Sequence, residues 1–224
     1  MINSIIESFN IDKDVLLKAL FETLEMLGVA LIFTFIFGLI IGIILFITRN
    51  KGLYENKVVY FITSTIVNII RSVPFILFII ILIPLTRVIV GTGFGVNASK
   101  FPLSIVGIAT FARLVEQALL SVNKDIYETS YALGANTFQY FKSFLLRESR
   151  QFLVLSFVST TISLISYSTV VGVIAGGGLG YLAINEGYQN FNYPLMWIII
   201  IIMIIIVQAV QGLGNLVAKK IDKR

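Results

Sequence analysis

Residues 124–150 read KDIYETSYALGANTFQYFKSFLLRESR and separate two long apolar stretches of the chain. A chain that only recrosses a bilayer needs a few residues for its turn, whereas this segment uses about two dozen and has the length of a helix-turn-helix. It carries Glu128, Gly134, two lysines and two arginines, with Leu133, Phe138, Phe141, Phe144 and Leu145 between them. This amphipathic pattern indicates a segment that lies against a soluble partner.

The composition places the chain in a membrane. It has 224 residues, of which 57% are hydrophobic and only 13% charged. Soluble domains have about 45–50% apolar and about 25% charged residues, so the surplus of apolar side chains needs lipid to face. The net charge of +5 is more typical of topology-setting basic residues than of a nucleic-acid partner.

The composition also excludes several kinds of chemistry. The sequence contains no cysteine and no histidine, which removes disulfides, the thiolate nucleophile, the commonest general base and the commonest metal ligand. The glycines between residues 86 and 101 do not form a G-x-x-x-x-G-K-[ST] phosphate loop, and no such loop occurs elsewhere. We therefore expect no metal and no cofactor in this chain, and no ATP site of its own.

Apolar runs of about 20 residues predict membrane-spanning helices. We expect an all-α polytopic membrane protein whose residues 1–224 form a single transmembrane domain, with a cytoplasmic loop at 123–150. The second span should enter over residues 58–70, kink at Pro74 and continue to residue 85. The third should start at Pro102 as a helix N-terminus, and residues 172–193 should form a loop. The predicted spans are about 20–47, 58–85, 102–122, 151–171 and 194–216.

Charged and small residues inside the spans suggest helix contacts. A charge in mid-membrane is costly, so Arg71 should face protein or water, either as a structural tether or in contact with substrate or a helix end. Arg113 and Glu116 are three residues apart and share a helix face, which predicts a mutually neutralising pair turned away from lipid. Gly38 and Gly42 allow a close helix contact, within the subunit or in a dimer.

The fourth span carries a stripe of hydroxyl groups. Residues at three- and four-residue steps share one side of a helix, and here they are Ser156, Thr160, Ser163, Tyr167 and Val170. The stripe has two compatible interpretations: polar contacts between helices, or the lining of a path for a solute with polar and apolar parts. Val170, at the outer end, is a candidate gate residue where two subunits meet.

The distribution of basic residues predicts the orientation. With five spans and a cytoplasmic C-terminus, four basic residues lie outside (Lys13, Lys18, Arg87 and Lys100) and eleven lie inside: Arg49, Lys51, Lys57, Lys124, Lys142, Arg147, Arg150, Lys219, Lys220, Lys223 and Arg224. We therefore expect the N-terminus outside the cell and the 124–150 segment in the cytoplasm. The first residues show no signal-peptide pattern, so the N-terminus is expected to be retained.

At the 124–150 segment the sequence resembles the membrane permeases of bacterial ABC importers. Their cytoplasmic loop carries a glutamate and two alanines, then a glycine, and later an Ile-x-Leu-Pro ending. Glu128, Gly134 and Leu146 stand in register with this pattern, whereas Thr129 and Ser130 replace the alanines and the closing proline is absent. The helix after the loop is therefore expected to enter the membrane with less of a break.

The likeness to the methionine importer permeases extends over nearly the whole chain. It is carried by the runs Asn68–Phe75, Ile83–Thr92, Arg113–Leu120 and Gly176–Gly180.

This resemblance implies the importer-permease fold in a bacterial inner membrane and a homodimer bound to two ATPase subunits that hold ATP and Mg²⁺. It also implies an extracytoplasmic binding lipoprotein that delivers D- or L-methionine. It places a coupling helix near residues 126–135, seated in a cleft of the ATPase, with the coupling residues Glu128, Tyr131, Ala132, Leu133, Gly134 and Ala135. Gly134 allows a tight turn between two short helices, and Tyr131 and Leu133 can serve as apolar anchors.

Three other functions compete with this hypothesis. A permease for another small amino acid is the nearest alternative. A membrane-embedded enzyme would need a convergent nucleophile and base, for which histidine and cysteine are missing. An ion-coupled carrier usually shows inverted repeats and mid-membrane carboxylates, and five spans cannot divide into equal halves.

Overall fold

The computed structural model describes residues 13–123, 125–174 and 176–222, and 86% of these described residues are helical. No strand occurs within these described ranges. The elements are α2 (Lys13–Thr48), α3 (Lys57–Ser72), α4 (Phe75–Val90), α5 (Val96–Leu120), α6 (Asp125–Ala132), α7 (Thr137–Gln139), the π-helical η1 (Tyr140–Leu145), α8 (Leu146–Val173), α9 (Gly178–Tyr181), the π-helical η2 (Leu182–Gln189) and α10 (Tyr193–Ile221).

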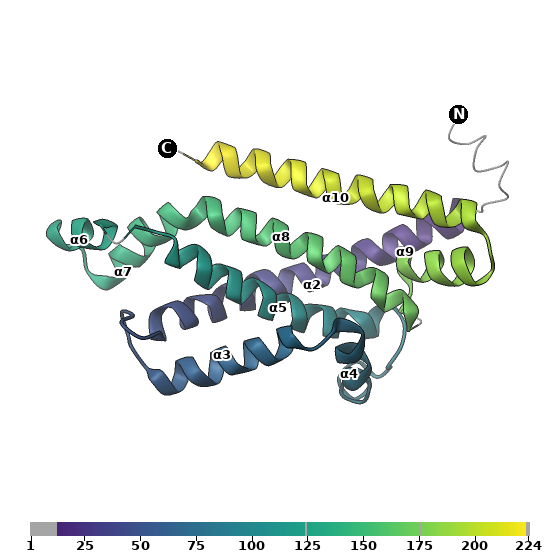
Figure 1. Cartoon of the computed structure of the whole chain (residues 1–224), viewed down its shortest axis with the longest axis horizontal. Coiled ribbons are helices and arrows are strands. Elements are labelled where there is room, and N and C mark those ends of the chain that lie inside the picture. The colour runs from purple at the N-terminus through teal and green to yellow at the C-terminus, as the bar shows by residue number, and fades with distance from the viewer. Residues whose placement is uncertain (1–12, 124, 175, 223–224) are drawn as a thin grey trace.

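The long helices α2, α3, α5, α8 and α10 run along one axis and form an elongated bundle (Figure 1). The short helices α6 and α7 project from one end, toward which α10 also ends, whereas α2 begins at the opposite end near α9. Four helical stretches are long and apolar enough to cross a membrane, and the pair α3 and α4 supplies a fifth if counted as one broken span. The predicted all-α membrane fold is confirmed, and the five predicted spans compare with four to five candidate spans in the structure.

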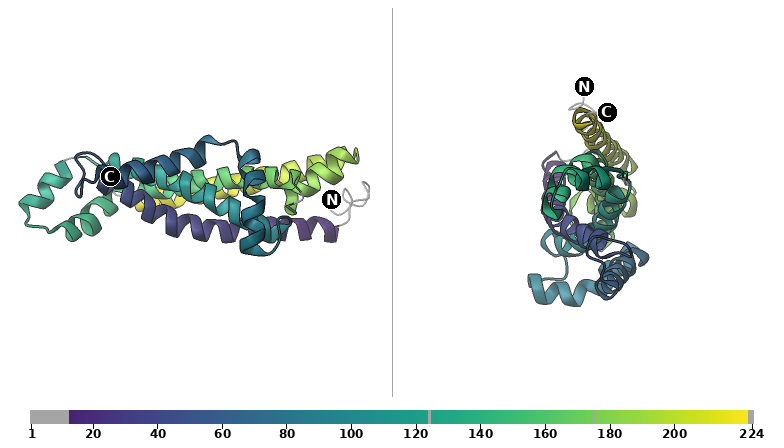
Figure 2. Two further views of the ribbon diagram at one scale, coloured as in Figure 1. Left: turned by 90° about the horizontal axis from the view of Figure 1, so that it is seen from below. Right: turned by 90° about the vertical axis from the view of Figure 1, so that its left-hand side faces the viewer.

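The second predicted span is not a continuous kinked helix. The helices α3 and α4 meet at 111°. In Figures 1 and 2, α4 lies across the long axis of the bundle instead of along it. Val73 has extended backbone angles, φ −80° and ψ 128°, as expected because the ring of Pro74 disfavours a helical conformation in the residue before it. The predicted break at Pro74 is present, but the bend of 111° is much sharper than the expected kink.

Two further boundaries differ from the sequence-based expectation. The helix α5 begins at Val96 after Gly95, which has a φ of +89°, so Pro102 lies inside the helix instead of starting it. Residues 172–193 form mostly helix, because α9 and η2 occupy 178–189. By contrast, α7, η1 and α8 run as one helical stretch from Thr137 to Val173, which confirms that this helix enters the bundle with little break.

The glycines at 38 and 42 serve a contact within the subunit. A Cβ added at Gly42 would lie 2.5 Å from the Cβ of Val115 and 2.6 Å from the carbonyl oxygen of Ala112. One added at Gly38 would lie 2.9 Å from the ring of Phe111. The two glycines thus allow α2 to lie directly on α5, and this seam is the central packing contact of the fold.

A polar cluster attaches α3 to α5. Arg113 donates from Nη1 to Oε2 of Glu116 at 2.5 Å, and from Nη2 to Asn68 Oδ1 at 2.7 Å and Ser64 Oγ at 2.9 Å. The hydroxyl of Tyr60 donates to the other carboxylate oxygen of Glu116 at 3.3 Å. The predicted pair of Arg113 and Glu116 is present, and both side chains are largely buried, at 14% and 4% exposed. Each charge is therefore paired and hydrogen-bonded inside the protein, as a charge in a membrane helix requires.

We expect Gly42→Ala to lower the thermal unfolding midpoint of the purified protein, because the added methyl overfills the α2–α5 seam and such overpacking costs about 1–3 kcal/mol. Gly28→Ala is the matched control on the same helix, since a Cβ there meets nothing within 4 Å. Equal midpoints for the two variants would contradict the seam described above.

Replacing Arg113 alone by Leu should destabilise the protein strongly, because the Glu116 carboxylate then stays buried without its cation, which costs about 3–5 kcal/mol. The double variant Arg113→Leu, Glu116→Leu should recover most of the loss in thermal unfolding experiments. A double variant no more stable than the single one would show that the two charges do not compensate each other.

Candidate functional site

Residues 125–145 form a helical hairpin of α6, α7 and η1 at one end of the bundle. The helix α6 ends in a Schellman turn, in which the N–H of Ala135 donates to the carbonyl of Ser130 and the N–H of Gly134 to that of Tyr131. Gly134 occupies the left-handed position with a φ of +73°. The next helix is capped by Asn136 and Gln139, each of which accepts from the backbone N–H of the other. The predicted tight turn at Gly134 is confirmed.

The hairpin presents apolar side chains to its surroundings. The exposed fractions are 76% for Tyr131, 71% for Leu133 and 72% for Phe138, with Tyr127 at 46%. Glu128 is exposed in the first turn of α6, where a carboxylate is favoured by the helix dipole. Large exposed apolar side chains grouped with charges on a short helical projection are typical of a protein-binding surface.

The base of the hairpin is fixed to the bundle. Tyr140 and Leu145 of η1 are 8% and 1% exposed, and they share a core cluster with Val115 and Leu119 of α5. The ring of Tyr127 on α6 meets that of Tyr140 edge-to-face at 5.2 Å. The helix α6 is therefore linked through Tyr140 to the core cluster that contains the end of α5.

Two hydroxyl groups of the stripe on α8 donate to carbonyl groups of the same helix. Thr160 is fully buried and donates to the carbonyl of Ser156, and Ser163 donates to that of Ser159. The ring of Tyr167 stacks on Phe75 of α4 at 4.7 Å. Within this subunit the stripe thus faces α4 in part, and its assignment to a translocation path remains a prediction. The role of Val170 as a gate also stays a prediction. Its side chain packs against the buried core cluster that contains Val171.

The other candidate residues lie apart from the hairpin. Arg71 is exposed in the last turn of α3, and its role as tether or substrate contact stays a prediction. Arg113 and Glu116 belong to the polar cluster between α3 and α5. Among the coupling residues, Ala132 is exposed and Ala135 is half-buried at the hairpin turn.

The glycine-rich turn at the end of the bundle opposite the hairpin is hydrogen-bonded to α2, which is distant from it in sequence. The N–H of Gly178 donates to the Glu22 carboxylate and that of Leu179 to the Thr23 hydroxyl, both at 2.8 Å. These α2 groups cap the N-terminus of α9, as a carboxylate and a hydroxyl do well. Sequence reasoning missed Glu22 and Thr23, which lie among other polar residues in the first turns of α2, so that nothing in the local pattern singled them out.

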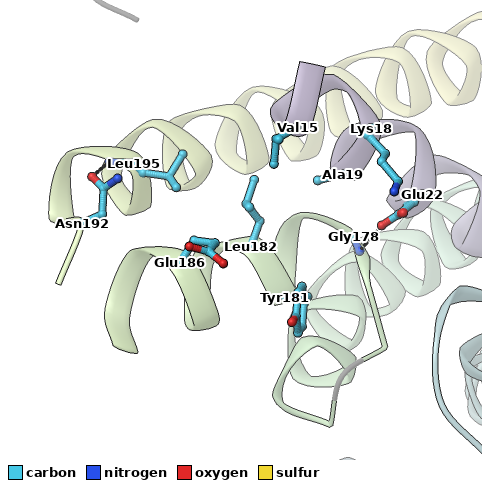
Figure 3. A pocket seen from close by; sticks show the side chains of 10 residues that line it. All are labelled: Val15, Lys18, Ala19, Glu22, Gly178, Tyr181, Leu182, Glu186, Asn192 and Leu195. Carbon is cyan, nitrogen blue, oxygen red and sulfur yellow. Dashed lines mark hydrogen bonds between the residues drawn. The ribbon is translucent and has the colours of Figure 1, made fainter. Parts of the chain in front are cut away.

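A recess of 420 Å³ opens beside this turn, between α2, α9, η2 and the start of α10. Figure 3 shows Lys18 and Glu22 on α2 and Glu186 on η2, with apolar side chains between them. Ala19, Leu182 and Leu195 form a buried apolar floor. The recess can accept a protruding side chain that combines an apolar body with a polar tip.

Comparison with known proteins identifies the fold and the family. Residues 35–223 match the model of the family described as "Binding-protein-dependent transport system inner membrane component". The chain is 36% identical to a probable D-methionine transport system permease protein of Vibrio cholerae, over 99% of both chains. It is 40% identical to a methionine import system permease protein of Bacillus subtilis, over 96% of this chain and 97% of the relative.

A solved structure agrees with these matches. The chain superposes with a TM-score of 0.90 on a chain of an inward-facing MetNI methionine ABC transporter, at 36% identity and over 94% of this chain and 98% of the other. A second, amino acid ABC transporter at 17% identity and a TM-score of 0.77 shares the fold. These matches favour a transport component with the importer-permease fold over the two alternative hypotheses of a membrane-embedded enzyme and an ion-coupled carrier.

The projecting hairpin, the bundle of spans and the match over residues 35–223 agree, and the chain belongs to the family of inner-membrane components of binding-protein-dependent transport systems.

Proposed function

We propose that this chain is the membrane-spanning permease subunit of an ATP-driven importer for methionine. The relatives that match over almost their full length are named for methionine or D-methionine transport, and this supports the substrate. The observation that carries the mechanism is the exposed hairpin of α6 and α7, whose apolar side chains have no cover in the described residues while its base is buried in the bundle.

The assembly that fits this subunit contains two copies of it, two ATPase subunits and an extracytoplasmic binding lipoprotein. Each hairpin would seat in a cleft of one ATPase, with Tyr131 and Leu133 as anchors and Glu128 toward its rim. ATP and Mg²⁺ would be held by the ATPase, in keeping with the missing phosphate loop of this chain. The lipoprotein would dock at the opposite end, where the recess beside α9 opens.

The mechanical step follows from how the hairpin is attached. When the ATPase subunits close on ATP, each seated α6 moves with them, and Tyr140 and Leu145 transfer this movement to α5. Because α5 is joined to α2 through the glycine seam and to α3 through the Arg113 cluster, these helices tilt as one rigid body. This tilt would open a path between the two subunits, with the α8 stripe as a candidate lining and Val170 as a candidate gate.

Uptake measured in proteoliposomes tests the proposal. The chain co-expressed with the ATPase and lipoprotein encoded beside it should show ATP-dependent methionine uptake. The variant Gly134→Val should lose at least tenfold in uptake and in ATPase co-purification, because a β-branched residue is strained at a φ of +73°.

The matched control is Gly134→Asn, because asparagine tolerates the left-handed conformation and the space around the position is open. It should retain most of the ATPase and most of the uptake. Full uptake by the Gly134→Val variant would refute the coupling role of the turn. If both variants lose uptake but still co-purify with the ATPase, the loss does not come from detachment of the ATPase.

We also propose that residues 1–224 form one transmembrane domain with the C-terminus in the cytoplasm and the N-terminus outside, which the excess of basic residues at the hairpin end supports. A reporter enzyme fused after Arg224 should therefore show cytoplasmic activity, and one inserted after Gly93 should show external activity. The reverse pattern would overturn the orientation and, with it, the placement of the ATPase.

A further inference from the structure

A deep apolar groove follows the outer face of the α2–α5 seam. It has a volume of 540 Å³, and its walls come from both helices and from the connection between α4 and α5. Its aromatic side is formed by Phe33 and Phe37, which stack at 6.0 Å and are each 46% exposed. Ile105 and Ile108 of α5 form the facing wall.

One end of the groove carries an ion pair. The Lys100 ammonium donates to Glu25 Oε1 at 2.5 Å and to Asn97 Oδ1 at 2.7 Å. A lysine ammonium has three donors, so one remains for another acceptor. The Glu25 side chain is 57% exposed, and among the described residues its second oxygen accepts no hydrogen bond. The pair thus offers one donor and one carboxylate oxygen side by side at the mouth of an apolar groove.

Helix geometry places this ion pair at the level of the lipid headgroups. With a rise of 1.5 Å per residue, the distance along α2 from Glu25 to Thr48 is about 35 Å, and along α5 from Lys100 to Leu120 it is about 30 Å. Both lengths match the hydrocarbon thickness of about 30 Å. The groove reaches Phe37, about 18 Å below Glu25, and so extends from one interface roughly to the middle of the bilayer.

We infer that this groove holds one phosphatidylethanolamine molecule of the leaflet opposite the hairpin. An acyl chain would lie along Phe33 and Phe37, the phosphate would accept from Lys100, and the primary ammonium would donate to Glu25. The ion pair selects this headgroup because it presents both signs of charge. A choline headgroup has no N–H to donate, and an anionic headgroup without an amine would add a second negative charge beside Glu25 without bringing a cation of its own.

Tryptophan quenching by brominated lipids tests this inference. The sole tryptophan of the chain, Trp197, is replaced by Phe, and Phe33→Trp is introduced as the reporter in the groove. The full importer complex is reconstituted in mixtures of phosphatidylcholine with dibrominated phosphatidylethanolamine, phosphatidylcholine or phosphatidylglycerol. We expect the relative affinity for phosphatidylethanolamine over phosphatidylcholine to be at least threefold at this reporter.

Two matched controls separate the groove from ordinary lipid contact. Ile32→Trp lies one residue away at the same depth, on a side chain that is 61% exposed and does not line the groove, and it should show no headgroup preference. Glu25→Gln should bring the ratio at Phe33→Trp to one, whereas Glu186→Gln, an acid away from the groove, should leave it unchanged.

Each contrary outcome would overturn the inference. These are an equal ratio at Phe33→Trp and Ile32→Trp, a preference that survives Glu25→Gln, a preference for phosphatidylglycerol, or a groove reporter that no brominated lipid quenches because protein covers it. Native mass spectrometry of the complex provides an independent readout, since one retained phosphatidylethanolamine per subunit should disappear in Glu25→Gln. Methionine uptake is not part of either readout, so the result does not depend on the proposed function.

Discussion

The close contact of α2 with α5 is the constraint on which the rest of the structure depends. In a membrane, the hydrophobic effect does not drive helices together, so helix association relies on close packing and on hydrogen bonds between helices. Because Gly42 has no side chain, the backbones of α2 and α5 can approach closely, and Val115 fills the space beside it. Once this pair is joined, α8 and α3 have a surface to pack on, and the groove on its outer side is a consequence of the same contact.

The two ends of the bundle differ in structure. At the hairpin end, apolar side chains are exposed on a short, well-capped projection whose base is buried. At the opposite end, a glycine-rich turn is capped by Glu22 and Thr23 and bordered by a recess. The long helices α5 and α2 both contribute to contacts at each end of the bundle. This arrangement suits a subunit that couples events on two sides of a membrane.

Much of this could be predicted from the sequence because it depends on local properties. Hydrophobic length locates spanning helices, and residue spacing places Arg113 beside Glu116. The Gly134 turn and the hairpin also follow from local conformational preferences. The α3–α4 bend was underestimated, since a proline signals a break but not the angle across it, which depends on what the second half packs against: here the Phe75 ring on Tyr167.

The sequence by itself determined that the chain is a helical membrane protein, where its polar hairpin lies and that Gly134 forms the hairpin turn, because each of these is decided within a few residues. Only the tertiary structure decided which helices share the glycine seam, that Glu22 and Thr23 cap a turn 156 residues away, and that Lys100 and Glu25 meet at the mouth of a groove. Such pairings depend on the packing of distant segments, and the free energy of packing is a property of the assembled bundle, not of any single stretch.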